Sequence, residues 1–240
     1  MTGAFLNASG ILLGALFGLA HRAPPAASTQ IFFRRTLGVA TIFAGLRLVW
    51  LNVNGTFGSC ARQIFIALLA LILGNLTGRL LGLQKISNRL GRFAGNLIAD
   101  GRPGTPRKSA GGFIACTILF CAAPLGLPGA VTDGLSGDFY LLAVKAVMDG
   151  LAMSGFVKMS GWLAALSAFP VYAFLGALTL ACQFYAKPFL DAHGLLNSVA
   201  VAAGFIASAV ALVIFEARKV ELANYLPALA VAPLLTRLVG

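Results

Sequence analysis

The sequence predicts an all-α membrane protein, a polytopic helix bundle of seven or eight segments. Of its 240 residues, 59% are hydrophobic and only 10% are charged, and the mean hydropathy is +0.89. A soluble domain carries about a quarter charged residues, so this chain lacks the polar surface to cover a soluble globule. The net charge of +11 falls in short gaps between apolar runs, which fits the positive-inside rule and argues against a nucleic-acid-binding protein.

Apolar stretches alternate along the chain with turns and charged residues, which mark the ends of the predicted membrane segments. A loop with arginines and prolines at 21–35 follows the first stretch, and a Gly/Ser turn at 54–62 follows the second. We expect one transmembrane domain over residues 1–240, with segments at about 3–20, 36–53, 64–83, 113–131, 139–157, 161–183, 195–215 and 224–240.

The first two segments carry features that bear on packing. Gly10, Gly14 and Gly18 recur at every fourth position of the first segment. Small residues at this spacing let a second helix approach closely, although the ordinary glycine content of membrane helices explains them nearly as well. In the second segment, Arg47 is predicted to extend to the membrane interface near Trp50.

Residues 84–112 form the longest polar stretch, with six basic residues against one acidic residue, Asp100. Such a run is typical of a cytoplasmic loop; its first part fits a short amphipathic helix on the membrane surface, and residues 101–106 fit a turn. The basic loop at 21–35 would lie on the same side. The N-terminus and the weakly charged turn at 54–62 are then expected outside.

The fifth segment, 139–157, is unusual because it contains both Lys145 and Asp149. Its eight Leu, Val and Phe residues each favour insertion by roughly 0.3 to 0.6 kcal/mol, whereas each of the two charges costs roughly 2.5 to 3.5 kcal/mol. The balance is unfavourable, so this helix must be sheltered by its neighbours or re-enter the membrane. With Pro124 and Pro128 in the fourth segment, residues 113–160 are predicted to form a broken, polar central hairpin.

A weak internal repeat relates the two ends of the chain. When residues 68–82 are aligned with residues 226–240, at a constant offset of 158 (226 minus 68), seven positions are identical. Apolar sequences also match by chance, so the repeat is a hypothesis. It would make 1–83 and 161–240 two three-helix repeats of opposite orientation around the central hairpin, a recurring plan in transporters.

The candidate site lies in this centre. Lys145 and Asp149 are four residues apart and share a helix face, so they form either a neutralising salt bridge or a cation site in which the lysine is an internal cation. Asp133 and Asp138 are expected in an outward-facing DGLSGD turn. Aspartates beside glycine are ordinary in turns, yet two together could form an acidic mouth that attracts cations.

Three asparagines lie within or at the edge of segments: Asn7, Asn75 and Asn197. Hydrogen bonding between helices is the first expectation for each, and a place along a solute or ion pathway is the second. Carboxylates, hydroxyls and freed carbonyls could supply oxygen ligands, but the residues specify no particular metal.

Catalytic chemistry finds little support. The four cysteines, Cys60, Cys116, Cys121 and Cys182, have no CxxC spacing, and the two histidines, His21 and His193, sit near chain turns. No phosphate loop or HExxH motif is present. We therefore predict neither an enzyme nor a cofactor.

At DGLSGD (133–138), with Lys145 and Asp149–Gly150 following, the sequence resembles the YqgA/YdfK-like family of uncharacterised bacterial inner-membrane proteins. The likeness continues through SAFPV (167–171) and ANYLPALAVAPLL (223–235), and more loosely through NASGILLGALFG (7–18). Members of this group, which is defined by a domain of unknown function, are often labelled transport proteins. The resemblance implies a multi-pass protein of the bacterial cytoplasmic membrane and supplies no substrate.

The function predicted from the sequence is a membrane transporter or channel-like carrier for a small solute, with a cation slightly favoured. The alternative is a non-transporting scaffold or regulatory subunit whose glycine-rich faces bind partner helices. Expected partners are the lipid bilayer and a small solute or ion, with no nucleic acid. The glycine-rich faces are compatible with a homo-oligomer such as a homodimer.

Overall fold

The computed structural model describes residues 1–21, 26–99, 106–218 and 220–239. Every regular element in these ranges is helical, which confirms the predicted all-α class. The helices are α1 (Thr2–Ala20), α2 (Ala27–Asn52), α3 (Phe57–Leu80), α4 (Leu83–Ala99), α5 (Pro106–Cys121), α6 (Gly126–Ser136), α7 (Tyr140–Ser160), α8 (Ala168–Ala181), α9 (Lys187–Ala192), α10 (Leu196–Ile214) and α11 (Ala228–Val239).

Short irregular helices join some of these elements. A 3₁₀ helix, η1 (Trp162–Ser167), leads into α8, and a π-helical turn, η2 (Cys182–Ala186), joins α8 to α9. A second 3₁₀ helix, η3 (Leu222–Tyr225), precedes α11. These pieces merge with their neighbours into two long apolar segments, Trp162–Ala192 and Leu222–Val239.

All eight predicted membrane segments correspond to helices. Six helical segments are long and apolar enough to cross a membrane, and the bent pair α5–α6 makes seven if it is one span. The six are Thr2–Ala20, Phe57–Leu80, Tyr140–Ser160, Trp162–Ala192, Leu196–Ile214 and Leu222–Val239. The remaining segment is α2, which is long enough but carries Arg34, Arg35 and Arg47. The chain therefore has the architecture of a multi-pass membrane protein.

Two predicted turns differ from the structure. Helix α2 begins at Ala27, so Arg34 and Arg35 lie in a helix and not in a loop; arginine is a good helix former, and the helix continues beyond its apolar part. Residues 133–136 of the DGLSGD motif form the last turn of α6. Gly137 ends that helix at φ 74°, a left-handed conformation that glycine adopts without steric cost.

Other predictions fall on or near residues that the structure does not describe. Residues 101–105 of the turn expected at 101–106 lie outside the described residues. So do Arg22, Pro24 and Pro25 of the first loop and Gly240 of the repeat. A helix is observed where the first part of the polar stretch was predicted to be helical: α4 packs beside α5 and buries only Ala94.

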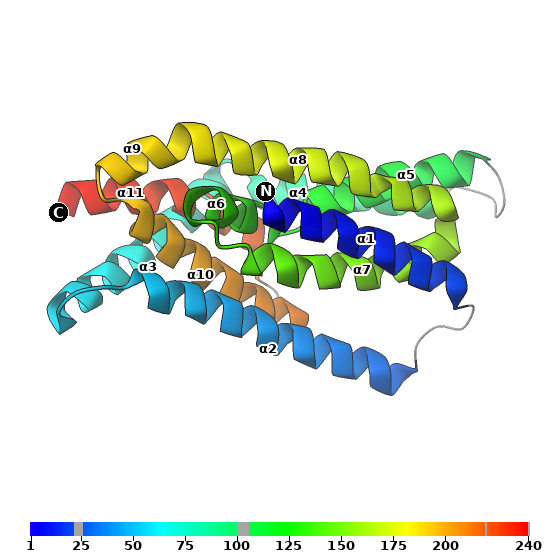
Figure 1. The fold of residues 1–240 in the computed structure, drawn as a ribbon, viewed down its shortest axis with the longest axis horizontal. Coiled ribbons are helices and arrows are strands. Elements are labelled where there is room, and N and C mark those ends of the chain that lie inside the picture. Colours follow the sequence, from blue (N-terminus) through cyan, green and yellow to red (C-terminus); the bar gives the residue numbers. More distant parts are fainter. Residues whose placement is uncertain (22–25, 100–105, 219, 240) are drawn as a thin grey trace.

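The predicted break in the fourth segment lies between α5 and α6. The two helices, taken from Ser109 and to Ser136, bend by 58° at this point. Pro124 explains part of the bend: it has no N–H for the carbonyl of Phe120, four residues earlier, so a continuous helix would lose a hydrogen bond here. The break lies in the middle of the molecule, where α6 packs against α7 and α8 (Figure 1).

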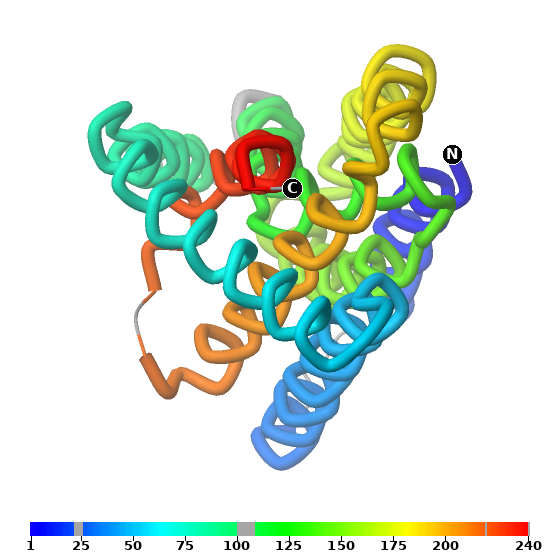
Figure 2. The backbone as a smooth tube through the Cα atoms, turned by 90° about the vertical axis from the view of Figure 1, so that its left-hand side faces the viewer, coloured from blue at the N-terminus to red at the C-terminus, as the bar shows by residue number. Residues whose placement is uncertain are grey.

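The bundle is organised by helix pairs from distant parts of the sequence. Helix α1 packs along α7, α2 along α10, and α3 along α11 (Figures 1 and 2). In the α2–α10 pair the close point is formed by two glycines. A Cβ on Gly45 would lie 2.6 Å from the carbonyl oxygen of Gly204, and a Cβ on Gly204 would lie 2.6 Å from that of Gly45.

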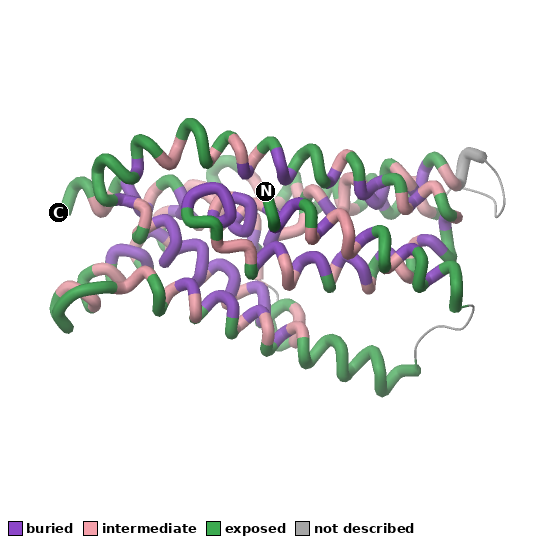
Figure 3. The backbone as a smooth tube through the Cα atoms, in the orientation of Figure 1, coloured by how far each residue is buried: buried purple, intermediate pink, exposed green. Residues whose placement is uncertain are grey.

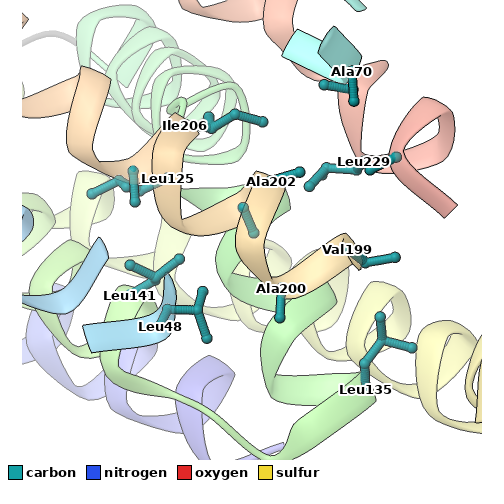
Figure 4. Packing of buried hydrophobic residues seen from close by; sticks show 14 of the residues in the cluster. Leu48, Ala70, Leu125, Leu135, Leu141, Val199, Ala200, Ala202, Ile206 and Leu229 are labelled. Carbon is teal, nitrogen blue, oxygen red and sulfur yellow. The ribbon is translucent and has the colours of Figure 1, made fainter. Parts of the chain in front are cut away.

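The apolar core surrounds α10. Side chains from α2, α3, α6, α7 and α11 converge on it, among them Leu48, Leu141 and Leu229, and Ile206 of α10 lies in the same cluster (Figure 4). A second cluster joins α1 to α7, α5 and α8. By contrast, the first turns of α2 are exposed along their length (Figure 3). The two clusters bracket the middle of α7, where the predicted charge pair lies.

Candidate functional site

The predicted pair of Lys145 and Asp149 lies inside the protein. The ammonium Nζ of Lys145 forms an ion pair with Oδ2 of Asp149 one helical turn further along α7. Lys145 is 0% exposed and Asp149 is 5% exposed. Taking two charges out of water costs several kcal/mol per ion, and this cost is offset only when partners and hydrogen bonds surround them. The shelter that the insertion energies required is therefore present.

A third residue, Asn7 of α1, completes this cluster. Its amide Nδ2 donates to Oδ2 of Asp149 at 2.9 Å, and the residue is fully buried. The amide oxygen Oδ1 of Asn7 is buried and has no hydrogen-bond partner among the described atoms. We call Asn7, Lys145 and Asp149 the central cluster. It is closed to the surface, yet it retains one unsatisfied acceptor.

Close packing of α1 on α7 places Asn7 within reach of Asp149. A Cβ on Gly150 would lie 2.6 Å from the carbonyl oxygen of Gly10, and Gly14 faces the carbonyl of Gly150 in turn. Side chains at these positions would hold the helices apart. The predicted glycine face of the first segment is therefore a helix-packing surface. It brings Asn7 close enough to donate a hydrogen bond to Asp149.

Helix α6 forms the other wall of the cluster, beside the bend. A Cβ on Gly126, the first residue of α6, would lie 3.3 Å from Cε of Lys145 and 3.5 Å from Leu175 of α8. The aliphatic part of Lys145 thus runs past the break between α5 and α6. The interrupted helix ends lie near the lysine, as expected for a polar site at a broken membrane helix.

Asp133 lies in a different setting from the one predicted. It is 6% exposed, within α6, and not in an outward-facing turn. Its Oδ2 accepts a hydrogen bond from the backbone N–H of Gly3 at 3.1 Å and lies 3.1 Å from the amino group of Met1. A carboxylate at this place satisfies a free N–H group of the first turn of α1 and complements the helix dipole.

Asp138 follows Gly137 and forms a separate interaction. Its Oδ2 accepts a hydrogen bond from Arg47 of α2 at 2.5 Å, and its Oδ1 accepts from the backbone N–H of Tyr140 at 3.2 Å. The guanidinium of Arg47 also lies 4.0 Å from the centre of the Tyr140 ring. Arg47 was predicted near Trp50 at the interface. In the structure it ties α2 to the start of α7.

This interaction gives a prediction about stability. The side chains of Arg47 and Asp138 are 29% and 12% exposed, so the pair is partly desolvated. We expect Asp138→Ala to lower the free energy of unfolding by about 1–2 kcal/mol, measured by unfolding in mixed detergent micelles. Asp191→Ala, at an exposed aspartate of α9, is the control and should change it by less than about 0.5 kcal/mol. Equal effects would contradict a structural role for the Arg47 pair.

The two other asparagines lie apart from the central cluster. Asn75 of α3 donates to the hydroxyl of Tyr225 at 3.4 Å, which is the interhelical hydrogen bond predicted for it. Asn197, at the start of α10, is exposed and lines a cavity of about 190 Å³ with Arg62, Gln63 and Thr236. Asn7 alone of the three joins the predicted charge pair.

The sequence did not single out Arg47 or Tyr225 as site residues. In both cases the partner lies far along the chain, at Asp138 and Asn75. No local spacing signals such contacts. Among the described residues, no group of three or more His, Cys, Asp or Glu side chains is placed to hold a metal ion.

Comparison with known proteins identifies the family. A family described as "Protein of unknown function (DUF554)" matches residues 2–237. The uncharacterized protein YqgA of Escherichia coli (strain K12) is 29% identical over 233 residues, which cover 96% of this chain and 94% of YqgA. The uncharacterized membrane protein YdfK of Bacillus subtilis (strain 168) is 21% identical over 234 residues, 97% of this chain and 94% of YdfK.

No solved structure gives a significant match. The family match and both relatives extend over nearly the whole chain, so the resemblance noted in the sequence is confirmed. One relative is named a membrane protein, in agreement with the six apolar helical segments. The chain belongs to the DUF554 family of proteins of unknown function.

Proposed function

We propose that this protein is a transporter or channel-like carrier of the bacterial cytoplasmic membrane that moves a small solute, with a cation favoured, through the central cluster. The observation that carries this proposal is the buried Lys145–Asp149 pair next to an Asn7 oxygen that has no partner in the described part of the chain. Ionisable residues inside a membrane bundle are costly, and they commonly mark substrate or ion pathways.

The unsatisfied acceptor supports a cation in particular. A purely structural salt bridge is most stable when all its polar neighbours are satisfied. Here the carboxylate of Asp149 and Oδ1 of Asn7 are oxygen groups of the kind that bind hard cations, and Lys145 occupies the place of such a cation. In the proposed cycle a proton or metal cation displaces the Lys145 ammonium from Asp149 when the cluster opens.

The bend between α5 and α6 supports a way for the cluster to open. Gly126 permits close contact with Lys145, and Pro124 leaves the Phe120 carbonyl without its usual N–H partner. Broken helices at the centre of transporters supply freed carbonyls to a coordinated ion. We propose that movement of α6 relative to α7 exposes the cluster to one side of the membrane at a time.

We also propose that the two ends of the chain form an inverted repeat. Each helix of the first predicted repeat packs against its expected counterpart in the second: α1 on α8, α2 on α10, and α3 on α11. The pairs run in opposite directions (Figure 1). In α2 and α10 the contact is reciprocal at Gly45 and Gly204, which are 159 positions apart (204 minus 45), one more than the spacing of the sequence repeat.

One observation favours the alternative, a non-transporting scaffold or regulatory subunit. The cluster is closed, since Lys145 has no exposed surface and α1 lies in glycine contact with α7. A scaffold would keep this arrangement permanently. A transporter would show it only as an occluded or resting state, so flux measurements separate the two functions.

The test is ion flux in reconstituted vesicles. Sodium, potassium and proton gradients are imposed in turn, and flux is followed with ion-sensitive dyes. The doubly neutral variant Lys145→Met/Asp149→Asn avoids leaving one buried charge alone. We expect it to reduce the flux of the transported cation at least about tenfold, because the site for that cation is lost. Glu216→Gln, which neutralises a carboxylate in an exposed pair with Arg34, is the control and should leave flux unchanged.

Two outcomes would overturn this proposal. Unchanged flux in the Lys145→Met/Asp149→Asn variant would remove the central cluster from the pathway. Absence of flux for all three cations in the unmodified protein, reconstituted in folded form, would remove cation transport and favour the scaffold.

A further inference from the structure

A second polar cavity lies away from the central cluster. It has a volume of about 520 Å³ and is bounded by one face of α3, by α10, and by residues 218, 220–222 and 225, which lie between α10 and α11. In Figure 2, α3 passes beside α10, and η3 lies beside the end of α3. We call this space the α3–α10 cavity.

The lining of this cavity is graded from apolar to basic along α3. Leu71, Asn75 and Arg79 follow one another at intervals of four residues, so they lie on one face of the helix. Leu71 and Ile206 supply apolar surface, and Arg79 and Arg218 supply positive charge. A ligand that fills the cavity would therefore meet apolar surface at one end and guanidinium groups at the other.

The cavity has a net positive lining. Glu221 is the acidic residue among the lining residues, and its Oε2 lies 3.7 Å from Nε of Arg79, beyond hydrogen-bonding distance. The pair is 63% and 57% exposed, so the arginine keeps N–H donors for another partner. Arg218 makes no ion pair with the described residues. Guanidinium groups bind phosphate and carboxylate oxygens with paired hydrogen bonds.

Two further polar groups lie between the arginines and the apolar end. Asn75 donates to the hydroxyl of Tyr225 at 3.4 Å, and Oδ1 of Asn75 is buried with no hydrogen-bond partner among the described atoms. With the amide in this orientation, the Tyr225 hydroxyl keeps its own proton as a donor. With the amide reversed, Tyr225 donates to the amide oxygen and the amide nitrogen is the free donor. In either orientation one N–H or O–H donor remains for a bound oxyanion.

The wall that carries these groups is held in place. Gly78 of α3 packs directly against the backbone of Asn224, and Asn224 donates to Glu221 at 2.9 Å. The side-chain oxygen of Asn224 accepts from the backbone N–H of Gln84, and the side-chain oxygen of Gln84 accepts from the N–H of Ala223. The position of Glu221 and Tyr225 is therefore fixed without a ligand.

From this geometry we infer that the α3–α10 cavity binds a phosphate-type oxyanion through Arg79, Arg218 and Tyr225. Two sources offer this chemistry. One is the headgroup of an anionic phospholipid, whose acyl part would lie towards Leu71 and Ile206. The other is a soluble phosphate. The site is separate from the central cluster, and it stands whether or not the protein transports a solute.

The experiment measures the thermal unfolding midpoint of the purified full chain in a neutral detergent. Phosphatidylglycerol, phosphatidylcholine and inorganic phosphate are added in separate series. We expect an anionic ligand to raise the midpoint, and Arg79→Gln/Arg218→Gln to weaken its apparent affinity at least about tenfold, because two charge-assisted contacts are lost. Arg35→Gln/Arg89→Gln removes the same charge from exposed positions in α2 and α4 and should keep the affinity.

The three additives distinguish the sources. A shift with phosphatidylglycerol alone assigns the site to lipid, and a shift with inorganic phosphate assigns it to a soluble anion. No shift with either anion, or equal loss in the two double variants, would overturn the inference. If Arg79→Gln/Arg218→Gln does not fold, Arg218→Gln alone decides the question, since Arg218 makes no ion pair with the described residues. An unchanged affinity in that variant would also overturn it.

Discussion

Lys145→Met should lower the free energy of unfolding by about 3–5 kcal/mol, one of the two largest effects expected in this chain. The substitution keeps the length of the side chain and removes its charge. Asp149, which is 5% exposed, would then remain as a buried carboxylate with only the Asn7 amide as a partner. An uncompensated charge in such a place costs more than the ion pair itself contributes, because its desolvation is no longer offset.

Removal of both charges should restore the free energy of unfolding. Lys145→Met/Asp149→Asn should be within about 1 kcal/mol of the unmodified protein, since a buried pair gains little over neutral groups of similar volume. Unfolding in mixed detergent micelles measures both variants. Arg34→Met is the control: Arg34 and Glu216 are 42% and 72% exposed, and an exposed pair contributes about 0–1 kcal/mol. Equal losses in the single and double variants would show that shape, and not charge, matters at this position.

Local sequence patterns predicted the helices because each helix is set by nearby residues. Apolar runs of about twenty residues, separated by basic or glycine-rich gaps, identified all eight segments. The patterns missed the boundary where a helix extends beyond its apolar part, as α2 does at Arg34 and Arg35. Composition marks where a helix enters a membrane. It does not mark where the helix ends.

The central cluster could be predicted only in part. The four-residue spacing of Lys145 and Asp149 predicted that they share a helix face and can pair. The insertion energies predicted that neighbouring helices must shelter them from lipid. The third member, Asn7, lies 142 residues from Asp149 in the sequence. Its contact depends on how closely α1 packs on α7, which is a property of the assembled bundle.

Arg47, Asp133 and Asp138 illustrate the same limit. Each was interpreted from its neighbours, as an interface arginine or as turn aspartates. In the structure Asp138 pairs with Arg47, 91 residues away, and Asp133 binds the N–H of Gly3, 130 residues away. A charged group in an apolar bundle takes whichever partner the fold brings to it, so its local sequence does not determine its role.

The contact between α1 and α7 gives the second large effect. Gly14→Leu should lower the free energy of unfolding by about 3 kcal/mol or more, because its Cβ would meet the backbone carbonyl of Gly150. A backbone atom cannot move aside as a flexible side chain can, so the two helices must separate. Separation also withdraws Asn7 from Asp149, so the loss should include the 2.9 Å hydrogen bond between them.

Gly155→Leu is the matched control for this prediction. Gly155 lies in α7, and a Cβ there would meet nothing within 4 Å. Leucine favours a helix over glycine by up to about 1 kcal/mol, so this variant should be neutral or slightly more stable. Unfolding in mixed micelles compares the two substitutions, which add the same side chain to helical glycines. If the two variants were similarly stable, the central cluster would tolerate a wider spacing of α1 and α7. The glycine contact would then not be the feature that positions Asn7.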